Sequence, residues 1–190
     1  MGIINILDII GAVGAFLATV AYIKISLWAW PISLVAIFTD IFLYYQKGIY
    51  GDMALQLIYL TFTLYGWYQW KFGGKEHKGL HIKSITIKQA LLLIIISICS
   101  ICIIFYILRS YTDSQIPFLD AATTVLSLIA QWMVCRKIIE NWALWLIIDS
   151  MYFGIYYYKN IPIHAALQII YFAMAIIGFW NWRKKKSTDK

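Results

Sequence analysis

Two aspartates lie deep inside long apolar stretches of this chain. Asp40 stands about ten residues into the stretch 29–46, and Asp149 stands about eight residues into 141–158. At about 1.5 Å of helix per residue, both lie near the midplane of a hydrocarbon layer about 30 Å thick. A carboxylate at that depth costs at least ~2.5–3.5 kcal/mol, so both side chains are expected to face a polar interior. There they either bind a substrate or join helices through hydrogen bonds to Ser, Thr or Tyr.

The residues around Asp149 indicate which substrate such a site would take. Trp142, Trp145, Asp149, Tyr152 and Tyr156 are spaced by three, four, three and four positions, so they lie on one face of a helix. Aromatic faces beside one carboxylate suit a flat organic cation, which stacks on the rings while the carboxylate balances its charge. The alternative is that these aromatics pack the core or form the belt at the membrane surface. Trp142 is expected in that belt, whereas Trp145 and Tyr152 are candidate substrate contacts.

Amide side chains add to the candidate site. Gln56 and Gln168 each precede a tyrosine by three positions, Tyr59 and Tyr171. A glutamine inside a membrane is costly unless it is paired, so these amides bind substrate groups or fasten helices together. Gln131 is a further isolated amide in the fifth apolar stretch. The predicted substrate-binding residues are Trp145, Asp149, Tyr152, Gln56, Tyr59, Gln168, Tyr171, Asp40 and Gln131.

The elements that position these residues are predicted to be membrane-spanning helices. Of the 190 residues, 62% are hydrophobic and 13% are charged, which leaves too little charge to cover the surface of a soluble domain. A span needs about 20 mainly apolar residues, and several stretches meet or approach that length. They are 4–23, 29–46, 52–70, 89–108, 117–135, 141–158 and 162–182. We therefore expect an all-α polytopic membrane protein with seven transmembrane helices.

The chain also contains an internal duplication. When it is shifted by 112 positions without a gap, residues 4–71 lie over 116–183, and 18 of the 68 aligned residues are identical. The identities include Asp, Lys, Gln and Gly, which shared apolar composition does not explain. A duplicated unit in so hydrophobic a chain is typical of transporters. Asp40 and Asp149 do not align with each other, so the copies differ near the midplane, where we place the substrate.

The duplication predicts an arrangement of three, one and three helices. Two adjacent triplets would face opposite ways, and the unmatched stretch 89–108 restores the orientation of the second one. The repeats are then parallel, related by an axis along the membrane normal. The predicted segments are a first repeat, a connection with a linker helix, a second repeat and a basic tail, at 4–71, 72–115, 116–183 and 184–190.

Charge gives the expected direction of insertion. With seven spans, 13 of the 16 basic residues fall on one side, and only Lys47, Arg109 and Lys159 fall on the other. Basic residues favour the cytoplasmic side, so we expect the N-terminus outside and the C-terminus in the cytoplasm of a bacterial inner membrane. The net charge of +7 is explained by this asymmetry. The lipid bilayer is an expected partner of the chain. Nucleic-acid binding is excluded, because the basic residues are scattered over loops without a soluble domain.

The residues that could support catalysis or metal binding are dispersed. The three histidines, His77, His81 and His164, are not spaced as metal ligands, and no Gly-rich phosphate loop is present. Cys99 and Cys102 form a CxxC inside the linker helix, away from further ligands. We therefore expect no enzyme activity, cofactor or metal. A membrane sensor or scaffold that binds a partner through the loop 71–88 is kept as a second reading, and a membrane enzyme as a weaker third.

The stretch from Glu140 to Asp149 resembles the signature of the PnuC vitamin transporters, in which a Trp is followed four positions later by Asn or Asp. The run from Ala54 to Trp70 and the Trp182-Arg183-Lys184 ending are also similar to that family. The resemblance covers essentially the whole chain. It implies that Trp145 and Asp149 contact the substrate.

The same resemblance implies a function and an assembly. The function is facilitated uptake of nicotinamide riboside, uncoupled from an ion gradient and driven by a cytosolic kinase that phosphorylates the vitamin. Thiamine or another flat heteroaromatic vitamin is the alternative substrate, because the aromatic stripe and Asp149 suit either cation. The implied fold is the full-length SWEET-like arrangement of 3+1+3 helices, and the implied assembly is a homotrimer.

Overall fold

The computed structural model describes residues 3–48, 50–74, 77 and 79–188, and all of its long elements are helices. Of the basic residues counted above, Lys75, Lys78 and Lys190 lie outside the described residues. The helices are α1 (Ile3–Ile23), α2 (Ala29–Lys47), α3 (Tyr50–Phe72), α4 (Ile87–Tyr111), α5 (Pro117–Cys135), α6 (Asn141–Tyr158) and α7 (Pro162–Thr188).

Local sequence explains where several helices begin. Proline lacks an N–H and is tolerated in the first turn of a helix, and every proline of this chain is placed there. Pro117 and Pro162 are the first residues of α5 and α7, and Pro31 is the third residue of α2. At α4, Thr86 accepts a hydrogen bond from the backbone N–H of Gln89, and the Gln89 side chain accepts one from the backbone N–H of Thr86. This reciprocal capping box fixes the start of the linker helix.

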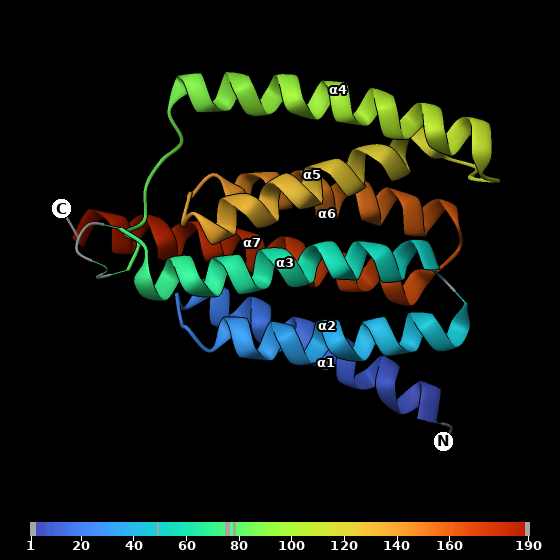
Figure 1. Ribbon diagram of the computed structural model, residues 1–190, viewed down its shortest axis with the longest axis horizontal. Helices are drawn as coiled ribbons and strands as arrows, with labels where there is room; N and C mark the ends of the chain where they lie inside the picture. The colour runs from blue at the N-terminus through green and yellow to red at the C-terminus, as the bar shows by residue number, and fades with distance from the viewer. Residues whose placement is uncertain (1–2, 49, 75–76, 78, 189–190) are drawn as a thin grey trace.

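Six of the helices form a closed ring. Around the ring, α1 packs against α2, α2 against α3, α3 against α5, α5 against α6, α6 against α7, and α7 against α1. The helix α4 packs against α5 outside the ring, along one edge of the molecule (Figure 1), and none of its residues is buried. The termini lie at opposite ends of the bundle. The ring therefore encloses a central space, and α4 takes no part in it.

The predicted helices are confirmed with small changes of length. α3 and α4 extend two to three residues further than expected, and α7 continues to Thr188, so most of the predicted basic tail is helical. Within the described residues, four helices are long and apolar enough to cross a membrane: α1, α4, α5 and α7. The others, α2, α3 and α6, carry more tyrosine, tryptophan and polar residues, which lowers their hydropathy.

An aromatic cluster closes one end of the ring, which we call the basic end because Lys24, Arg136 and Arg183 lie there. Ring centroids in this cluster lie 5.0–5.8 Å apart from one contact to the next, mostly edge to face. We call it the aromatic floor. It consists of Tyr22, Trp30, Trp70, Trp142 and Trp182.

The floor corrects the expectation that Trp142 lies in a surface belt, and it also buries other tryptophans near helix ends. Trp142, Trp70 and Trp182 are buried, and Trp182 is 0% exposed, whereas Trp180 is 60% exposed and fits the belt. The reason is that glycines make room for indole rings. A Cβ atom at Gly178 would lie 2.6 Å from the Trp142 ring, and one at Gly66 would overlap Trp30. The two glycines therefore permit close packing of the helices.

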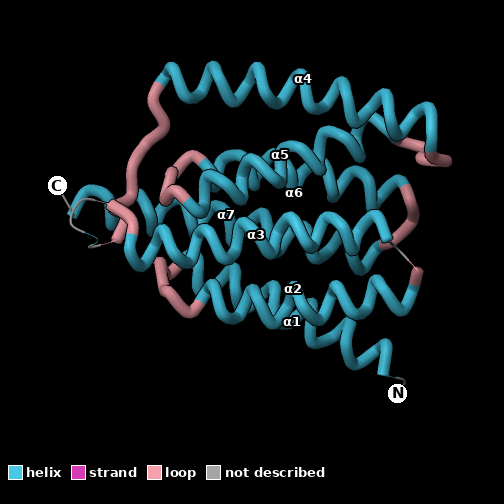
Figure 2. The backbone as a smooth tube through the Cα atoms, viewed as in Figure 1, coloured by secondary structure: helices cyan, strands magenta, loops and turns pink. Residues whose placement is uncertain are grey.

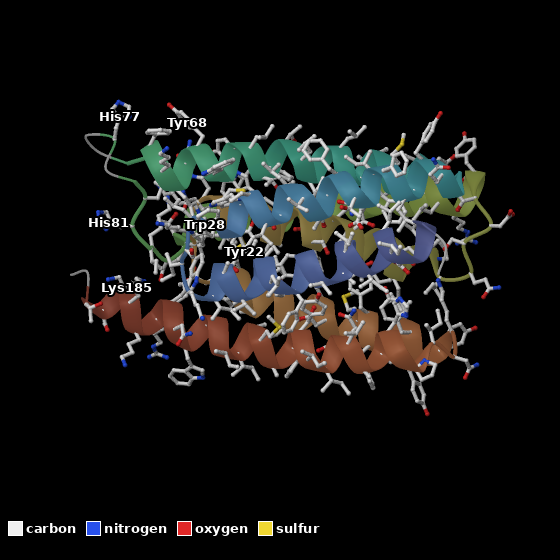
Figure 3. The ribbon with its side chains drawn as sticks, turned by 90° about the horizontal axis from the view of Figure 1, so that it is seen from below. Tyr22, Trp28, Tyr68, His77, His81 and Lys185 are labelled. Carbon is white, nitrogen blue, oxygen red and sulfur yellow. The ribbon has the colours of Figure 1, made fainter. Side chains whose placement is uncertain are left out.

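Two crossed hydrogen bonds tie the floor together. The indole N–H of Trp70 in α3 donates to the carbonyl of Val134 in α5, and that of Trp182 in α7 donates to the carbonyl of Tyr22 in α1, each at 2.9 Å. The donors lie 112 positions apart, and so do the acceptors. Each bond therefore joins the first half of the chain to the second half. Figure 3 shows Tyr22 toward the same end of the molecule as His81 and Lys185.

The connection between α3 and α4 is folded against the bundle. In Figure 2 it runs from the end of α3 along the basic end toward α4. Lys83 exchanges two backbone hydrogen bonds of 3.0 Å with Lys137 and Ile139 of the α5–α6 loop. The Glu140 carboxylate accepts a further bond of 2.9 Å from the Ile85 N–H. Burial, and after it the positive charge of Arg136, lower the pKa of Lys83.

Candidate functional site

A cavity of about 340 Å³ lies inside the six-helix ring, and the aromatic floor lies at its basic end. Its size falls within the range of pockets that bind small molecules. Side chains from α1, α2, α3, α5, α6 and α7 line it, and α4 contributes none. The cavity extends from Trp142 and Val134 beside the floor to Tyr156, two residues before the end of α6. It therefore reaches from the basic end past the middle of the bundle.

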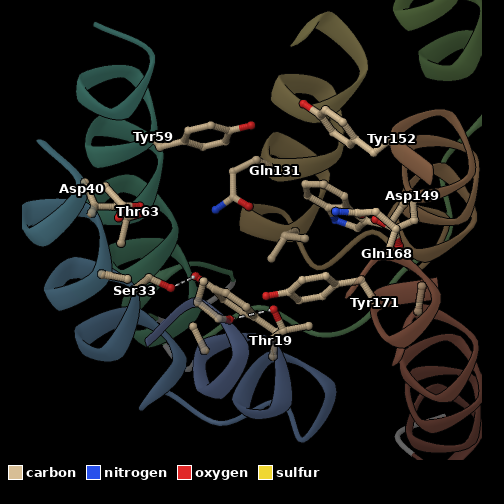
Figure 4. A pocket seen from close by; sticks show the side chains of 18 of the residues that line it. Thr19, Ser33, Asp40, Tyr59, Thr63, Gln131, Asp149, Tyr152, Gln168 and Tyr171 are labelled. Atoms are coloured by element: carbon tan, nitrogen blue, oxygen red, sulfur yellow. Dashed lines mark hydrogen bonds between the residues drawn. The ribbon is translucent and has the colours of Figure 1, made fainter. Parts of the chain in front are cut away.

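The structure brings every predicted site residue to this cavity. They come from five helices that are far apart in the sequence, and the ring places them around one space (Figure 4). Their contact with substrate stays a prediction. The residues are Asp40, Gln56, Tyr59, Gln131, Trp145, Asp149, Tyr152, Gln168 and Tyr171.

One side of the cavity is aromatic and carries a carboxylate, and we call it the aromatic side. It is formed by Trp145, Asp149 and Tyr152 of α6. Asp149 is only 7% exposed, and Tyr152 stacks on Tyr156 with the ring planes 16° apart. Figure 4 shows Asp149 beside Gln168 and Tyr171. A flat cation in this space would meet aromatic faces and one negative charge.

The second carboxylate lies across the cavity from the first. Figure 4 shows Asp40 and Asp149 on opposite sides. Asp40 accepts a hydrogen bond of 2.9 Å from the Gln56 amide, so this acid and this amide are already partners. Gly11 of α1 faces the Asp40 carboxylate, and a side chain there would displace it. The Gln56 amide therefore serves the helix-joining role that the sequence left open, while still lining the cavity.

The first half of the chain also contributes hydroxyl groups that the sequence prediction missed. Tyr22 and Ser33 are hydrogen bonded at 2.9 Å, and Thr63 lies near them on α3. Helical spacing was a signal for two of them. Ser33 precedes Asp40 by seven positions, and Thr63 follows Gln56 by seven, so each lies on the same helix face as a predicted residue.

Trp142 was assigned to the surface belt, and the structure corrects this. Its ring lines the cavity and is also part of the aromatic floor, and its indole N–H has no hydrogen-bond partner among the described residues. The full stripe from Trp142 to Tyr156 on α6 therefore faces the cavity, as its spacing predicts.

The groups that line the cavity are suited to binding a small molecule. Among the described residues, no three His, Cys, Asp or Glu side chains lie close enough together to hold a metal ion. Cys99 and Cys102 are exposed on α4, far from the ring interior, and Cys135 is buried. The polar groups of the cavity are carboxylates, amides and hydroxyls placed to donate and accept hydrogen bonds.

Comparisons with known proteins agree with a transport site. The sequence profile of a family described as nicotinamide mononucleotide transporter matches residues 5–184. The nicotinamide riboside transporter PnuC of Neisseria mucosa is 24% identical over 188 residues, which cover 92% of this chain and 71% of that protein. The riboflavin/roseoflavin transporter RibM of Streptomyces davaonensis is 22% identical over 185 residues, covering 96% and 86%. The crystal structure of the vitamin B3 transporter PnuC has the same fold, with a TM-score of 0.75, 23% identity and coverage of 97% of this chain and 83% of that one.

Proposed function

We propose that this chain, which belongs to the nicotinamide mononucleotide transporter family, carries nicotinamide riboside across a membrane through the cavity inside its six-helix ring. The observation that carries the proposal is Asp149, a nearly buried carboxylate beside Trp145 and Tyr152. Nicotinamide riboside is a flat heteroaromatic cation, and this side of the cavity offers it ring faces and a counter-charge. The relative named as a nicotinamide riboside transporter adds support.

The proposal includes a direction and a repeat. We place the basic end in the cytoplasm, with the N-terminus outside and the C-terminus inside. We also propose that residues 4–71 and 116–183 are parallel three-helix repeats in a SWEET-like arrangement, joined by the linker α4. The crossed bonds from Trp70 and Trp182 support this pairing, because their partners are related by the same 112-residue shift.

The floor supplies a physical account of alternating access. It closes the basic end of the cavity, and its two crossed hydrogen bonds join α3 to α5 and α7 to α1. Release of substrate toward the basic end requires these bonds to break and the two halves to move apart. Such rocking of one half against the other is the usual motion of transporters built from repeats. We propose that binding at Asp149 precedes this opening.

The proposed energy source and the proposed assembly are those implied by the resemblance to the PnuC transporters. We propose that transport is uncoupled, and that a cytosolic kinase draws uptake by phosphorylating the vitamin. We also propose a homotrimer. Uptake into liposomes that hold no kinase should then stop at equal concentrations on both sides, and the mass of the purified protein should equal three chains.

Two other candidate substrates differ from nicotinamide riboside, one in charge and the other in lacking a sugar. Riboflavin is suggested by the relative named as a riboflavin/roseoflavin transporter, and it is neutral. Thiamine is a cation, as nicotinamide riboside is, but it carries no sugar. The buried Asp149 favours a cation over a neutral ring system, because an uncompensated charge in a dry cavity is costly.

The reading as a membrane sensor or scaffold is weakened by the α3–α4 connection. Its backbone groups at Lys83 and Ile85 already bond to the α5–α6 loop. A partner protein would have to displace these contacts before it could use the same groups.

Binding and uptake of the three vitamins test the proposal directly. Purified protein titrated with nicotinamide riboside should bind it with micromolar or tighter affinity, and should bind riboflavin at least tenfold more weakly. Liposomes holding the protein should take up labelled nicotinamide riboside chemically unchanged, as mass spectrometry of the recovered ligand would show. Preferred binding of thiamine or riboflavin would refute the substrate, and binding without uptake would refute transport.

A further inference from the structure

The two sides of the cavity differ in chemistry at matched positions. Under the 112-residue shift, Trp145 corresponds to Ser33, and Thr63 corresponds to Ala175. All of these residues line the cavity. At these two positions the first half of the chain carries a short hydroxyl side chain, whereas the second half carries an indole ring or a methyl group. A ligand that fills both sides would be equally unsymmetrical.

Thr63 is the sharpest feature of the first-half side. It is 1% exposed, it lines the cavity, and its hydroxyl has no hydrogen-bond partner among the described residues. A threonine inside a helix commonly donates to the carbonyl four residues earlier. Thr19 and Thr123 do so here, each at 2.9 Å. A buried hydroxyl without a partner is unfavourable, so its place at a cavity wall points to a partner that enters the cavity.

Further hydrogen-bonding groups surround Thr63. The hydroxyls of Tyr22 and Ser33 bond to each other, and a pair of hydroxyls bonded in this way still has one proton to donate and lone pairs to accept with. The Gln131 amide lies within reach of the Tyr22 hydroxyl. Figure 4 shows Ser33, Thr63 and Gln131 around the same part of the cavity. We call Tyr22, Ser33, Thr63 and Gln131 the hydroxyl side.

We infer that the hydroxyl side binds the sugar hydroxyls of the substrate, with Thr63 in direct hydrogen bond to one of them. The inference rests on the proposed function and deepens it. The ring of the substrate lies on the aromatic side beside Asp149, and the polyhydroxylated part extends toward α1, α2 and α3. The cavity then requires a flat cation that bears a sugar, and the substrate class is a pyridinium nucleoside.

This division has a consequence for specificity. A site built to hydrogen-bond a substrate hydroxyl strongly rejects an analogue without it, because its own polar groups are left unpaired. The aromatic side alone accepts any flat cation. The hydroxyl side therefore separates nicotinamide riboside from cations of the same ring that lack the sugar.

A matched pair of ligands tests the inference on the unaltered protein. Nicotinamide riboside and 1-methylnicotinamide share the ring and the positive charge, but the second has a methyl group in place of the sugar. We expect the riboside to bind at least a hundredfold more tightly by calorimetric titration. Equal affinity for the two ligands would overturn the inference while leaving the proposed function intact. Failure of the unaltered protein to bind either ligand would overturn both.

The variant Thr63→Val tests the named residue, because it keeps the shape and removes the hydroxyl. We expect it to weaken riboside binding about tenfold and to leave 1-methylnicotinamide binding unchanged, with Thr63→Ser restoring most of the loss. Thr123→Val is the matched control: it is also a buried threonine, 2% exposed, but it lies outside the cavity lining. It should alter neither affinity.

Two outcomes would contradict the assignment of Thr63. One is an equal loss for both ligands in Thr63→Val, which would indicate a structural role. The other is an unchanged riboside affinity. If Thr63→Val does not fold, deoxy analogues of the riboside replace it on the unaltered protein: removal of one particular sugar hydroxyl should then cost about tenfold, and no loss from any of them would refute the contact.

Discussion

The two halves of the chain contribute equivalent groups at the basic end of the ring but different groups in the adjoining cavity. At the basic end, Trp70 and Trp182 make the same bond to equivalent carbonyls, and Gly66 and Gly178 make room for equivalent rings. In the cavity, matched positions carry different chemistry, and Asp149 has no carboxylate at its counterpart, Ile37. The comparison indicates that both halves close the bundle with the same contacts, whereas each half contributes different groups for binding an unsymmetrical ligand.

The largest expected effect separates the two carboxylates of the cavity. Asp149→Ala should lower nicotinamide riboside uptake about 10–100-fold, because a hydrogen bond or contact with a charged partner contributes about 1.5–3 kcal/mol. Asp40→Ala should lower it only several-fold, since Asp40 already bonds to Gln56 and lies across the cavity. Initial rates in liposomes measure both, with the melting temperature as the control for folding. Equal losses would show that the cavity is not divided as described.

The second effect concerns the floor. Trp70→Phe and Trp182→Phe each keep a ring but remove the indole hydrogen bond, which contributes about 0.5–1.5 kcal/mol. The carbonyls of Val134 and Tyr22 keep the backbone bonds that they accept from Lys137 and Ile25. Because the bonds are equivalent, the two variants should lose similar amounts of stability, as thermal or denaturant unfolding in detergent would show. Trp180→Phe, an exposed tryptophan in the same region, serves as the control and should change little. A severe loss in one variant and none in the other would contradict the symmetry of the floor.

The smallest effect is one of stability in the absence of substrate. Thr63→Val removes an unpaired buried hydroxyl, so it should raise the free energy of unfolding by about 1 kcal/mol. Thr123→Val removes a hydroxyl that is paired with the Leu119 carbonyl, so it should lower that free energy by about 0.5–1.5 kcal/mol. Melting temperatures of the ligand-free variants measure the difference. Destabilisation of both by equal amounts would show that the Thr63 hydroxyl is already satisfied.

The helices and the residues of the site could be predicted because each produces a recognisable pattern of residue types in the sequence. Apolar runs of about 20 residues gave seven helices, and the spacing from Trp142 to Tyr156 gave one face of α6. The same spacing argument, applied to α2 and α3, would have found Ser33 and Thr63. A polar side chain in an apolar helix is informative because lipid would exclude it.

The floor could not be predicted in the same way. Trp70, Trp142 and Trp182 lie near helix ends, where a tryptophan at the membrane surface is the usual expectation. Gly178 makes room for the Trp142 ring, and backbone carbonyls of α5 and α1 accept the indole bonds of Trp70 and Trp182. A backbone carbonyl is present at every residue, so its use as an acceptor leaves no trace in the sequence.

The crossed tryptophan bonds also bear on how such a ring would arise. A pair of contacts in which one unit binds the other as the other binds it is the signature of a two-fold dimer of identical subunits. Two identical three-helix chains would close the floor equally well. In such a dimer an aspartate on the aromatic stripe would occur twice, once in each unit, and so would the stripe itself. Joining the two units in one chain lets a single half carry Asp149 while the other keeps Ile37 and Ser33.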